Sequence, residues 1–142
     1  MMCCDIWESF DEANNLLKEY THRKLLLRNR VKTLGNCVII TKRHIESLSD
    51  ITPEEMAEFA IVAKDVEKSL GASFGFDKMN YQMLMMKEKH VHFHAISRYA
   101  APKNFAGIER PDAGWPLLPP ANRSDITLET LQLVKQEILT HL

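Results

Sequence analysis

The chain has 142 residues, 18 Lys and Arg against 19 Asp and Glu, and 45% hydrophobic residues. This length suits one domain with its own core, and a formal charge of −1 excludes the broad basic surface on which general nucleic-acid binding depends. The N-terminus has no basic segment followed by an apolar run, so we expect neither a signal peptide nor a membrane span. Three cysteines, two of them adjacent, do not form a disulfide framework, and we expect a reducing compartment, by default the cytoplasm.

The first quarter of the chain predicts a helix and then a strand hairpin. Apolar residues recur at helical spacing over residues 5–20, which indicates an amphipathic helix. Two short apolar runs, residues 25–27 and 37–40, flank a polar stretch that contains Gly35. They predict two strands joined by a turn near this glycine.

A long helix is predicted next. Thr52 as N-cap, Pro53 at the first helical position and Glu55 two residues later form the pattern of a capping box. Apolar residues then keep helical spacing, and Gly71 is the predicted C-terminal cap. We expect this helix to lie across the sheet.

Three histidines mark the strands that follow. Residues 80–86 and 91–99 predict two strands joined by a charged turn. His90, His92 and His94 alternate with apolar residues, and strand side chains point to opposite faces with a period of two. The imidazoles would therefore share one face. A single histidine of this kind is most often a structural polar residue, whereas three in register indicate a site.

A metal site is the main rival interpretation, because imidazole is the commonest metal ligand. At roughly 3.3 Å rise per residue the first and third imidazoles leave the strand about 13 Å apart, so one ion cannot bind all three, although two can share one. Cys3 and Cys4 are adjacent rather than spaced as C-x-x-C. Arg43 and His44 are interpreted as a solvated strand end rather than as phosphate ligands. We predict no metal site. An extended polyanion suits the row of imidazoles better.

The C-terminal part combines an irregular segment and a helix. Prolines are frequent in residues 100–123, which predicts a long loop. It can cover a site, pack on a neighbouring subunit or run over the surface, and these alternatives stay open. Residues 128–141 predict a final helix with Thr127 or Asp125 as N-cap.

The run His90-Val-His92-Phe-His94-Ala-Ile96 resembles the histidine triad (HIT) motif, in which histidines alternate with apolar residues. Residues 35–50 and 80–85 also resemble HIT strands, and the resemblance covers about residues 24–99. Within the family, the chain is most similar to compact bacterial members described as diadenosine tetraphosphate hydrolases.

This resemblance implies an α+β fold, with an antiparallel sheet of about five strands, one long helix across it and additional helices at both ends. We expect a single HIT-like domain over residues 1–142, with its core at about 24–99 and a proline-rich segment and helix over 100–142. The resemblance also implies a homodimer.

The resemblance assigns roles to the triad. His92 would attack the α-phosphorus of a nucleotide through Nε2, while Nδ1 keeps its proton and donates a hydrogen bond to the backbone carbonyl of His90. His94 would donate hydrogen bonds to non-bridging and leaving-group oxygens. His90 would do the same where its ring reaches these oxygens. No cofactor is required, although a divalent cation can accompany a polyphosphate substrate.

Four further residues are candidate nucleotide or phosphate contacts. Asn29 falls close to a strand-end Asn that lies near the nucleotide in the family, with a simple turn residue as the alternative. Lys87 and Lys89 can place an ammonium beside a phosphate, with a solvated turn as the alternative. Arg98 completes the set.

Two positions depart from the family pattern. Asn36 stands where many members have a fourth histidine, and an amide cannot carry a proton in support of the nucleophile. Met86 and the charged turn stand where members commonly have a polar amide or hydroxyl, which bears on substrate choice.

The favoured hypothesis is a hydrolase or transferase that cleaves the α-phosphate linkage of dinucleoside polyphosphates or related nucleotide conjugates through a nucleotidyl-histidine on His92. The second is a nucleoside phosphoramidate hydrolase. The third is a non-catalytic nucleotide-binding regulatory protein, and a metal-binding protein that uses two of the triad histidines comes last.

Overall fold

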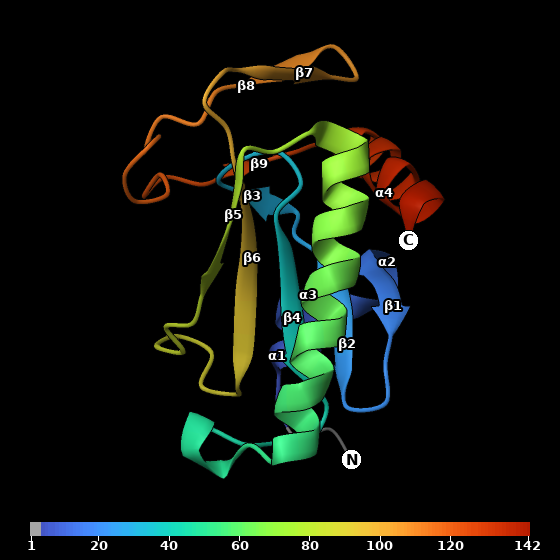
Figure 1. Ribbon diagram of the computed structural model, residues 1–142. Coiled ribbons are helices and arrows are strands. Elements are labelled where there is room, and N and C mark those ends of the chain that lie inside the picture. Colours follow the sequence, from blue (N-terminus) through green and yellow to red (C-terminus); the bar gives the residue numbers. More distant parts are fainter. Residues whose placement is uncertain (1–3) are drawn as a thin grey trace.

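A five-stranded antiparallel sheet forms the centre of the computed structural model, which describes residues 4–142. In spatial order its strands are β1 (Leu16–Glu19), β2 (Arg23–Leu27), β4 (Cys37–Thr41), β6 (His92–Arg98) and β5 (Lys78–Gln82). The helix α3 (Pro53–Phe74) runs along one face, and α4 (Leu128–His141) packs beside it (Figure 1). The predicted α+β class is confirmed, and so is the hairpin of β2 and β4 beside the triad strand.

Short elements connect and cover this sheet. They are α1 (Ile6–Ser9), α2 (Glu12–Asn15), β3 (Arg30–Val31), the 3-10 turn η1 (Leu48–Asp50), β7 (Lys103–Phe105), β8 (Ile108–Arg110) and β9 (Ser124–Asp125). Strands β7 and β8 form a hairpin, so the proline-rich segment is less irregular than predicted. Strand β9 pairs with β3, which brings the end of that segment to the loop after β2.

The predicted helix over residues 5–20 is wrong in its second half. Two single helical turns, α1 and α2, are separated at Asp11, whose φ of 51° is left-handed. The helical part of this segment ends at Asn15. Residues 16–19 instead form strand β1, which pairs with β2. The intrinsic preference of so short a segment for a helix is weak. Pairing with β2 decides the outcome, because it places the buried Leu17 in the core cluster of the sheet.

The two long helices begin where the sequence predicts. Thr52 Oγ1 accepts from the Glu55 amide at 3.1 Å and the Glu55 carboxylate accepts from the Thr52 amide at 2.9 Å, which confirms the capping box. Thr127 caps α4. Helix α3 passes the predicted end at Gly71 and stops at Gly75, because the extra turn buries Phe74. No helix within residues 4–142 has the length and apolar character needed to cross a membrane.

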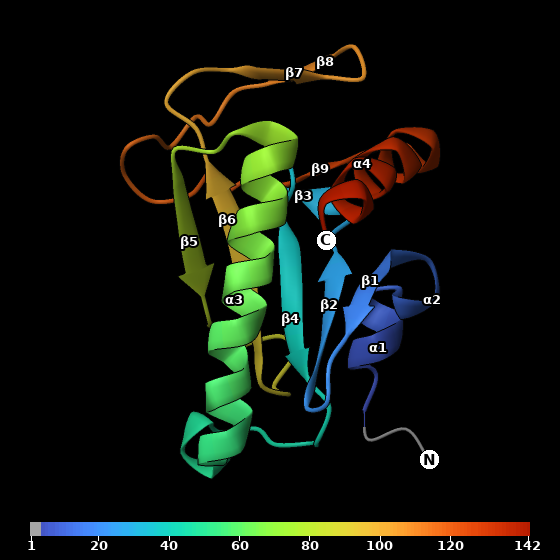
Figure 2. The same cartoon turned by 45° about the vertical axis from the view of Figure 1, so that its right-hand side comes forward.

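The sheet separates two apolar clusters. The larger lies on the side of α3 and includes Ile39, Phe93 and Ala95. The smaller contains Ile6, Phe10, Leu26, Val38 and Ile40. Figure 2 shows α1 and α2 on the side of the sheet away from α3. The N-terminal segment therefore covers the face opposite α3.

Candidate functional site

The strand register places the second and third triad histidines on the face that the N-terminal segment covers. His92 lies opposite Ile40, and His94 lies opposite Val38. Both partners belong to the smaller cluster, whereas Phe93 between the histidines packs in the larger one. The alternation predicted from the sequence is thus present, and it directs the two imidazoles away from α3.

His92 has one ring nitrogen fixed by the backbone. Its Nδ1 donates to the carbonyl oxygen of His90 at 2.6 Å, which is the hydrogen bond that the motif implies. Nε2 of the neutral ring is therefore unprotonated, and within residues 4–142 it makes no hydrogen bond. Burial lowers the pKa of His92 from its usual value. The ring is accordingly neutral near pH 7 and carries its lone pair on Nε2, as a nucleophile requires.

His94 has the opposite proton arrangement. Its Nδ1 lies 3.0 Å from Nη1 of Arg28, and a guanidinium only donates, so Nδ1 is the acceptor and Nε2 carries the proton. Burial, followed by the positive charge of Arg28, lowers the pKa of His94 to about 3. The imidazole is thus a neutral hydrogen-bond donor through Nε2.

A cleft of about 460 Å³ runs along this face and has both His92 and His94 in its wall. Its volume lies within the range of roughly 300 to 1,000 Å³ that is typical of small-molecule sites. Phe10 forms another part of the wall, with its ring centroid 5.5 Å from that of His92. The guanidinium carbon of Arg28 lies 4.7 Å from the Phe10 ring centroid. The cleft therefore combines an aromatic surface, two neutral imidazoles and a cation.

The predicted nucleotide contacts are only partly brought to this cleft. Lys87 lines it, whereas Asn29 and Lys89 do not. The chain alternates beyond Leu26 of the smaller cluster, so Arg28 rather than Asn29 faces the triad, and the role of Asn29 stays a prediction. The sequence gives no signal for Arg28, because its position beside the triad depends on the register at the end of β2.

The prediction that Arg98 contacts phosphate is not supported by its position. Its guanidinium forms a buried ion pair with Asp112, with Nε 2.6 Å from Oδ2, and it also donates to Asn80 at 2.8 Å. Its side chain is 3% exposed and that of Asp112 is not exposed at all. Arg98 thus anchors the proline-rich segment to the end of β6 and is not in the wall of the cleft.

Asn36 organises a turn. Its Oδ1 accepts from the amides of Lys32 at 2.7 Å and Thr33 at 3.1 Å, and its Nδ2 donates to Thr33 Oγ1 at 2.6 Å. Among the residues that the structure describes, none of the hydrogen bonds of Asn36 reaches the triad. Its amide therefore shapes the loop after β2 and does not support the nucleophile directly.

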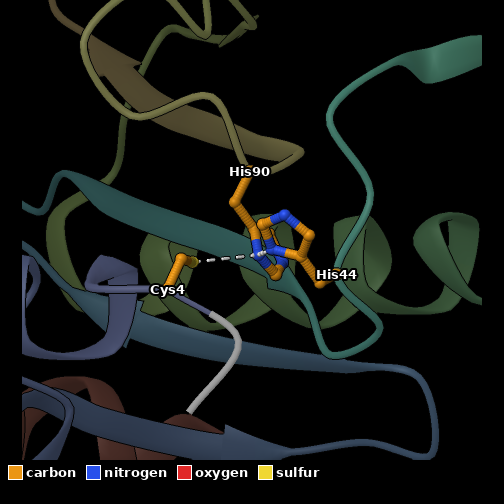
Figure 3. A group of neighbouring side chains, drawn as sticks. All are labelled: Cys4, His44 and His90. Atoms are coloured by element: carbon orange, nitrogen blue, oxygen red, sulfur yellow. Dashed lines mark hydrogen bonds between the residues drawn. The ribbon is translucent and has the colours of Figure 1, made fainter.

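His90 belongs to a different group of side chains. Figure 3 shows its ring beside His44, with Cys4 of the N-terminal segment close by. Nδ1 of His90 lies 3.1 Å from Nδ1 of His44 and 3.4 Å from Sγ of Cys4. Nε2 of His90 donates to the carbonyl oxygen of Thr41. The ring is thus turned away from the cleft, and His90 meets His92 through its carbonyl oxygen.

The three side chains of this group could supply three ligands to one metal ion. The ligand atoms of Cys4, His44 and His90 all lie within 4.8 Å of one another. Zinc bonds of about 2.0 Å to nitrogen and 2.3 Å to sulfur hold neighbouring ligand atoms roughly 3.3 to 3.6 Å apart. The distances from Nδ1 of His90 to Nδ1 of His44, 3.1 Å, and to Sγ of Cys4, 3.4 Å, are close to this range. Thr41 and Glu46 accept from the outer Nε2 atoms, so both Nδ1 atoms present lone pairs to the group.

The absence of a metal site thus stays a prediction, although the fold brings together a group of side chains that could bind an ion, and His44 belongs to this group. The sequence contains no recognisable ligand spacing, because Cys4 and His44 reach His90 only through the fold. The geometric argument against one ion on all three triad histidines still holds.

This chain resembles known proteins in its sequence and in its fold. A family model described as the HIT domain matches residues 11–101. A histidine triad (HIT) protein from Sinorhizobium meliloti superimposes with a TM-score of 0.74 at 18% identity, covering 95% of this chain and 94% of that one. A zinc-bound histidine triad family protein from Mycobacterium smegmatis gives 0.64 at 20% identity, with coverages of 98% and 95%.

A third similar structure is Plasmodium falciparum diadenosine triphosphate hydrolase in complex with cyclomarin A, with a TM-score of 0.65, 14% identity and coverages of 89% and 75%. No curated protein gives a significant match. The solved structures share the fold, and the family model spans more than half of the 142 residues. The resemblance seen in the triad is thus confirmed, and the chain belongs to the HIT-domain family.

Proposed function

We propose that this protein is a nucleotide hydrolase or transferase that cleaves the α-phosphate linkage of dinucleoside polyphosphates or related nucleotide conjugates. The observation that carries the proposal is the hydrogen bond from Nδ1 of His92 to the carbonyl oxygen of His90, which leaves Nε2 as a nucleophile in a ring that lines the cleft. The similarity to a diadenosine triphosphate hydrolase supports the same chemistry.

The reaction proceeds in two steps. Nε2 of His92 attacks the α-phosphorus, the bond from phosphorus to the leaving-group oxygen breaks, and a nucleotidyl-histidine forms. Water then attacks the same phosphorus, and the N–P bond breaks to release the nucleoside monophosphate and the free imidazole. A different acceptor in place of water makes the protein a transferase.

The neighbours of His92 have distinct parts in this reaction. His94 donates through Nε2 to a non-bridging oxygen and so stabilises the negative charge that develops in the transition state. His90 acts through its carbonyl oxygen, which holds the proton of His92 on Nδ1. Lys87 places an ammonium at the cleft wall, as a point charge beside the phosphate chain.

Two alternatives keep a nucleotide as the ligand. A nucleoside phosphoramidate hydrolase uses the same nucleophile with an amine as leaving group. A regulatory protein that binds nucleotide without turnover is suggested by Asn36, which supplies no proton to the triad, and by Met86, which is 80% exposed at the cleft. A homodimer and a cytoplasmic location remain our expectations for the protein.

Labelling of the protein tests this function directly. Purified protein is incubated with diadenosine tetraphosphate labelled at the α-phosphate and quenched in alkali, where a phosphorus–nitrogen bond to histidine survives. We expect label on the protein and release of nucleoside monophosphate. Faster cleavage of adenosine phosphoramidate would favour the amine leaving group. Tight binding with neither label nor product from either compound would contradict the enzyme and favour the regulatory protein.

The group of Cys4, His44 and His90 is proposed to bind zinc. The match of its interatomic distances supports this, and so does the similarity to a zinc-bound relative. Bound zinc would cross-link the N-terminal segment to the sheet. The group is outside the cleft wall, so the metal is assigned a structural role and takes no part in the reaction.

Removal and return of zinc checks this assignment. Metal-free protein should gain stability when zinc is added, by about 2.7 kcal/mol at a free concentration one hundred times the Kd. The gain should be absent from His44→Ala and retained in His141→Ala, which removes a partly exposed histidine on α4. Thermal melts with and without zinc measure it. Equal gains in wild type and His44→Ala would contradict the assignment.

A further inference from the structure

Four basic side chains gather at one end of the triad. Arg28, Arg30, Lys32 and Arg123 line a hollow together with His94. Arg28 follows β2, Arg30 lies in β3, Lys32 is in the next loop, and Arg123 immediately precedes β9. The pairing of β3 with β9 brings Arg123 to the others across more than ninety positions of sequence.

Among the described residues that line the hollow, none carries a negative charge to balance these positive charges. The pKa of Arg28 is lowered to about 10, first by burial and then by the charges of Arg123 and Arg30. Burial and then the charges of Arg123 and Arg28 also lower the pKa of Lys32. Arg30 forms an ion pair with Asp125 outside the lining of the hollow, at 3.2 Å. That pair is more than half exposed on both sides, so solvent screens it and it offsets little of the charge.

Arg28 also retains unused hydrogen-bonding capacity. The residue is 9% exposed, and its Nε is buried without a hydrogen-bond partner among the residues that the structure describes. Its Nη1 is engaged with Nδ1 of His94. A buried guanidinium with an unpaired donor costs stability, and a bound anion removes this cost.

The hollow continues into the cleft that contains the nucleophile. Arg28, Arg30, His94 and Arg123 line both. A substrate whose α-phosphorus lies at His92 therefore extends naturally toward the basic side chains. Arginine is suited to phosphate binding, because its planar guanidinium can donate two parallel hydrogen bonds to phosphate oxygens.

We propose that Arg28, Arg30, Lys32 and Arg123 form a subsite for a second phosphate group of the substrate, one that His92 does not attack. This inference rests on the proposed function, which supplies the attacked phosphate. The second group has two chemical sources: a later phosphate of a polyphosphate chain, or a phosphate on the ribose. Both present the same anionic oxygens to the subsite.

A comparison of substrates tests this subsite. Adenosine 5′-phosphoramidate carries only the attacked phosphorus, 3′-phosphoadenosine 5′-phosphoramidate adds a ribose phosphate, and diadenosine tetraphosphate extends the chain. We expect at least one of the last two to exceed the first in kcat/KM. In Arg123→Ala this ratio of kcat/KM values should fall about tenfold, because the variant loses roughly one charged hydrogen bond to the second phosphate. In Lys68→Ala, which removes an exposed charge from α3, the advantage should persist.

The outcomes separate the subsite from the reaction. An advantage confined to the tetraphosphate assigns the subsite to the chain, and one confined to the 3′-phosphate assigns it to the ribose. Cleavage of the simple phosphoramidate with no advantage for either added phosphate, or an equal advantage in wild type and Arg123→Ala, would overturn the subsite alone. No cleavage of any of the three would overturn the proposed function and the subsite with it.

Discussion

Replacing His92 with alanine should abolish formation of the nucleotidyl-enzyme and lower kcat by about 10⁴-fold or more. In the proposed reaction the imidazole supplies the attacking lone pair. The other imidazole among the described residues that line the cleft, His94, cannot replace it, because its Nδ1 accepts from Arg28. Alkaline-stable label and the rate of nucleoside monophosphate release measure the effect.

His94→Ala is the matched control for this prediction. It removes a neighbouring imidazole on the same strand face, yet the lost hydrogen bond to a phosphate oxygen should slow turnover by about 10²- to 10³-fold while label still appears. Label on the His92→Ala protein, or equal losses in both variants, would refute the assignment of His92 as the nucleophile. Circular dichroism of each variant establishes that the fold is retained.

Replacing Asp112 with alanine should lower the free energy of unfolding by about 3 to 5 kcal/mol, since it leaves the guanidinium of Arg98 buried without its counter-charge. The Asp112 carboxylate also accepts from the backbone amides of Tyr99 at 3.2 Å and Gly114 at 3.1 Å, so the same change removes the acceptor of two partly buried amides. Chemical denaturation measures the loss. Asp125→Ala removes an exposed carboxylate of a surface ion pair and should cost about 1 kcal/mol or less.

A double-mutant cycle completes this experiment. Arg98→Met in the Asp112→Ala background should cost less than it does alone, because the uncompensated charge has gone. Strictly additive losses would show that the buried ion pair is energetically unimportant. If Arg98→Met reduced kcat/KM without reducing the free energy of unfolding, the original expectation that Arg98 contacts phosphate would be restored.

Local patterns in the sequence were sufficient for much of the fold. The capping box at Thr52 and the period of two around His92 each depend on residues a few positions apart, and both are present in the structure. The helix expected up to residue 20 failed because pairing with β2 outweighs the weak propensity of a short segment. Helix α3 extends beyond its predicted end at Gly71, because the packing of Phe74 outweighs the tendency of a glycine to end a helix.

The sequence by itself determined the family, the fold class and the common face of His92 and His94, because the HIT motif lies within one strand and its alternation follows from backbone geometry alone. Only the tertiary structure decided which distant side chains meet. Cys4 and His44 join His90, and Arg123 joins Arg28, through strand pairing and chain reversal across long stretches of sequence. No local pattern encodes such contacts, since burial and pairing of the whole chain select them.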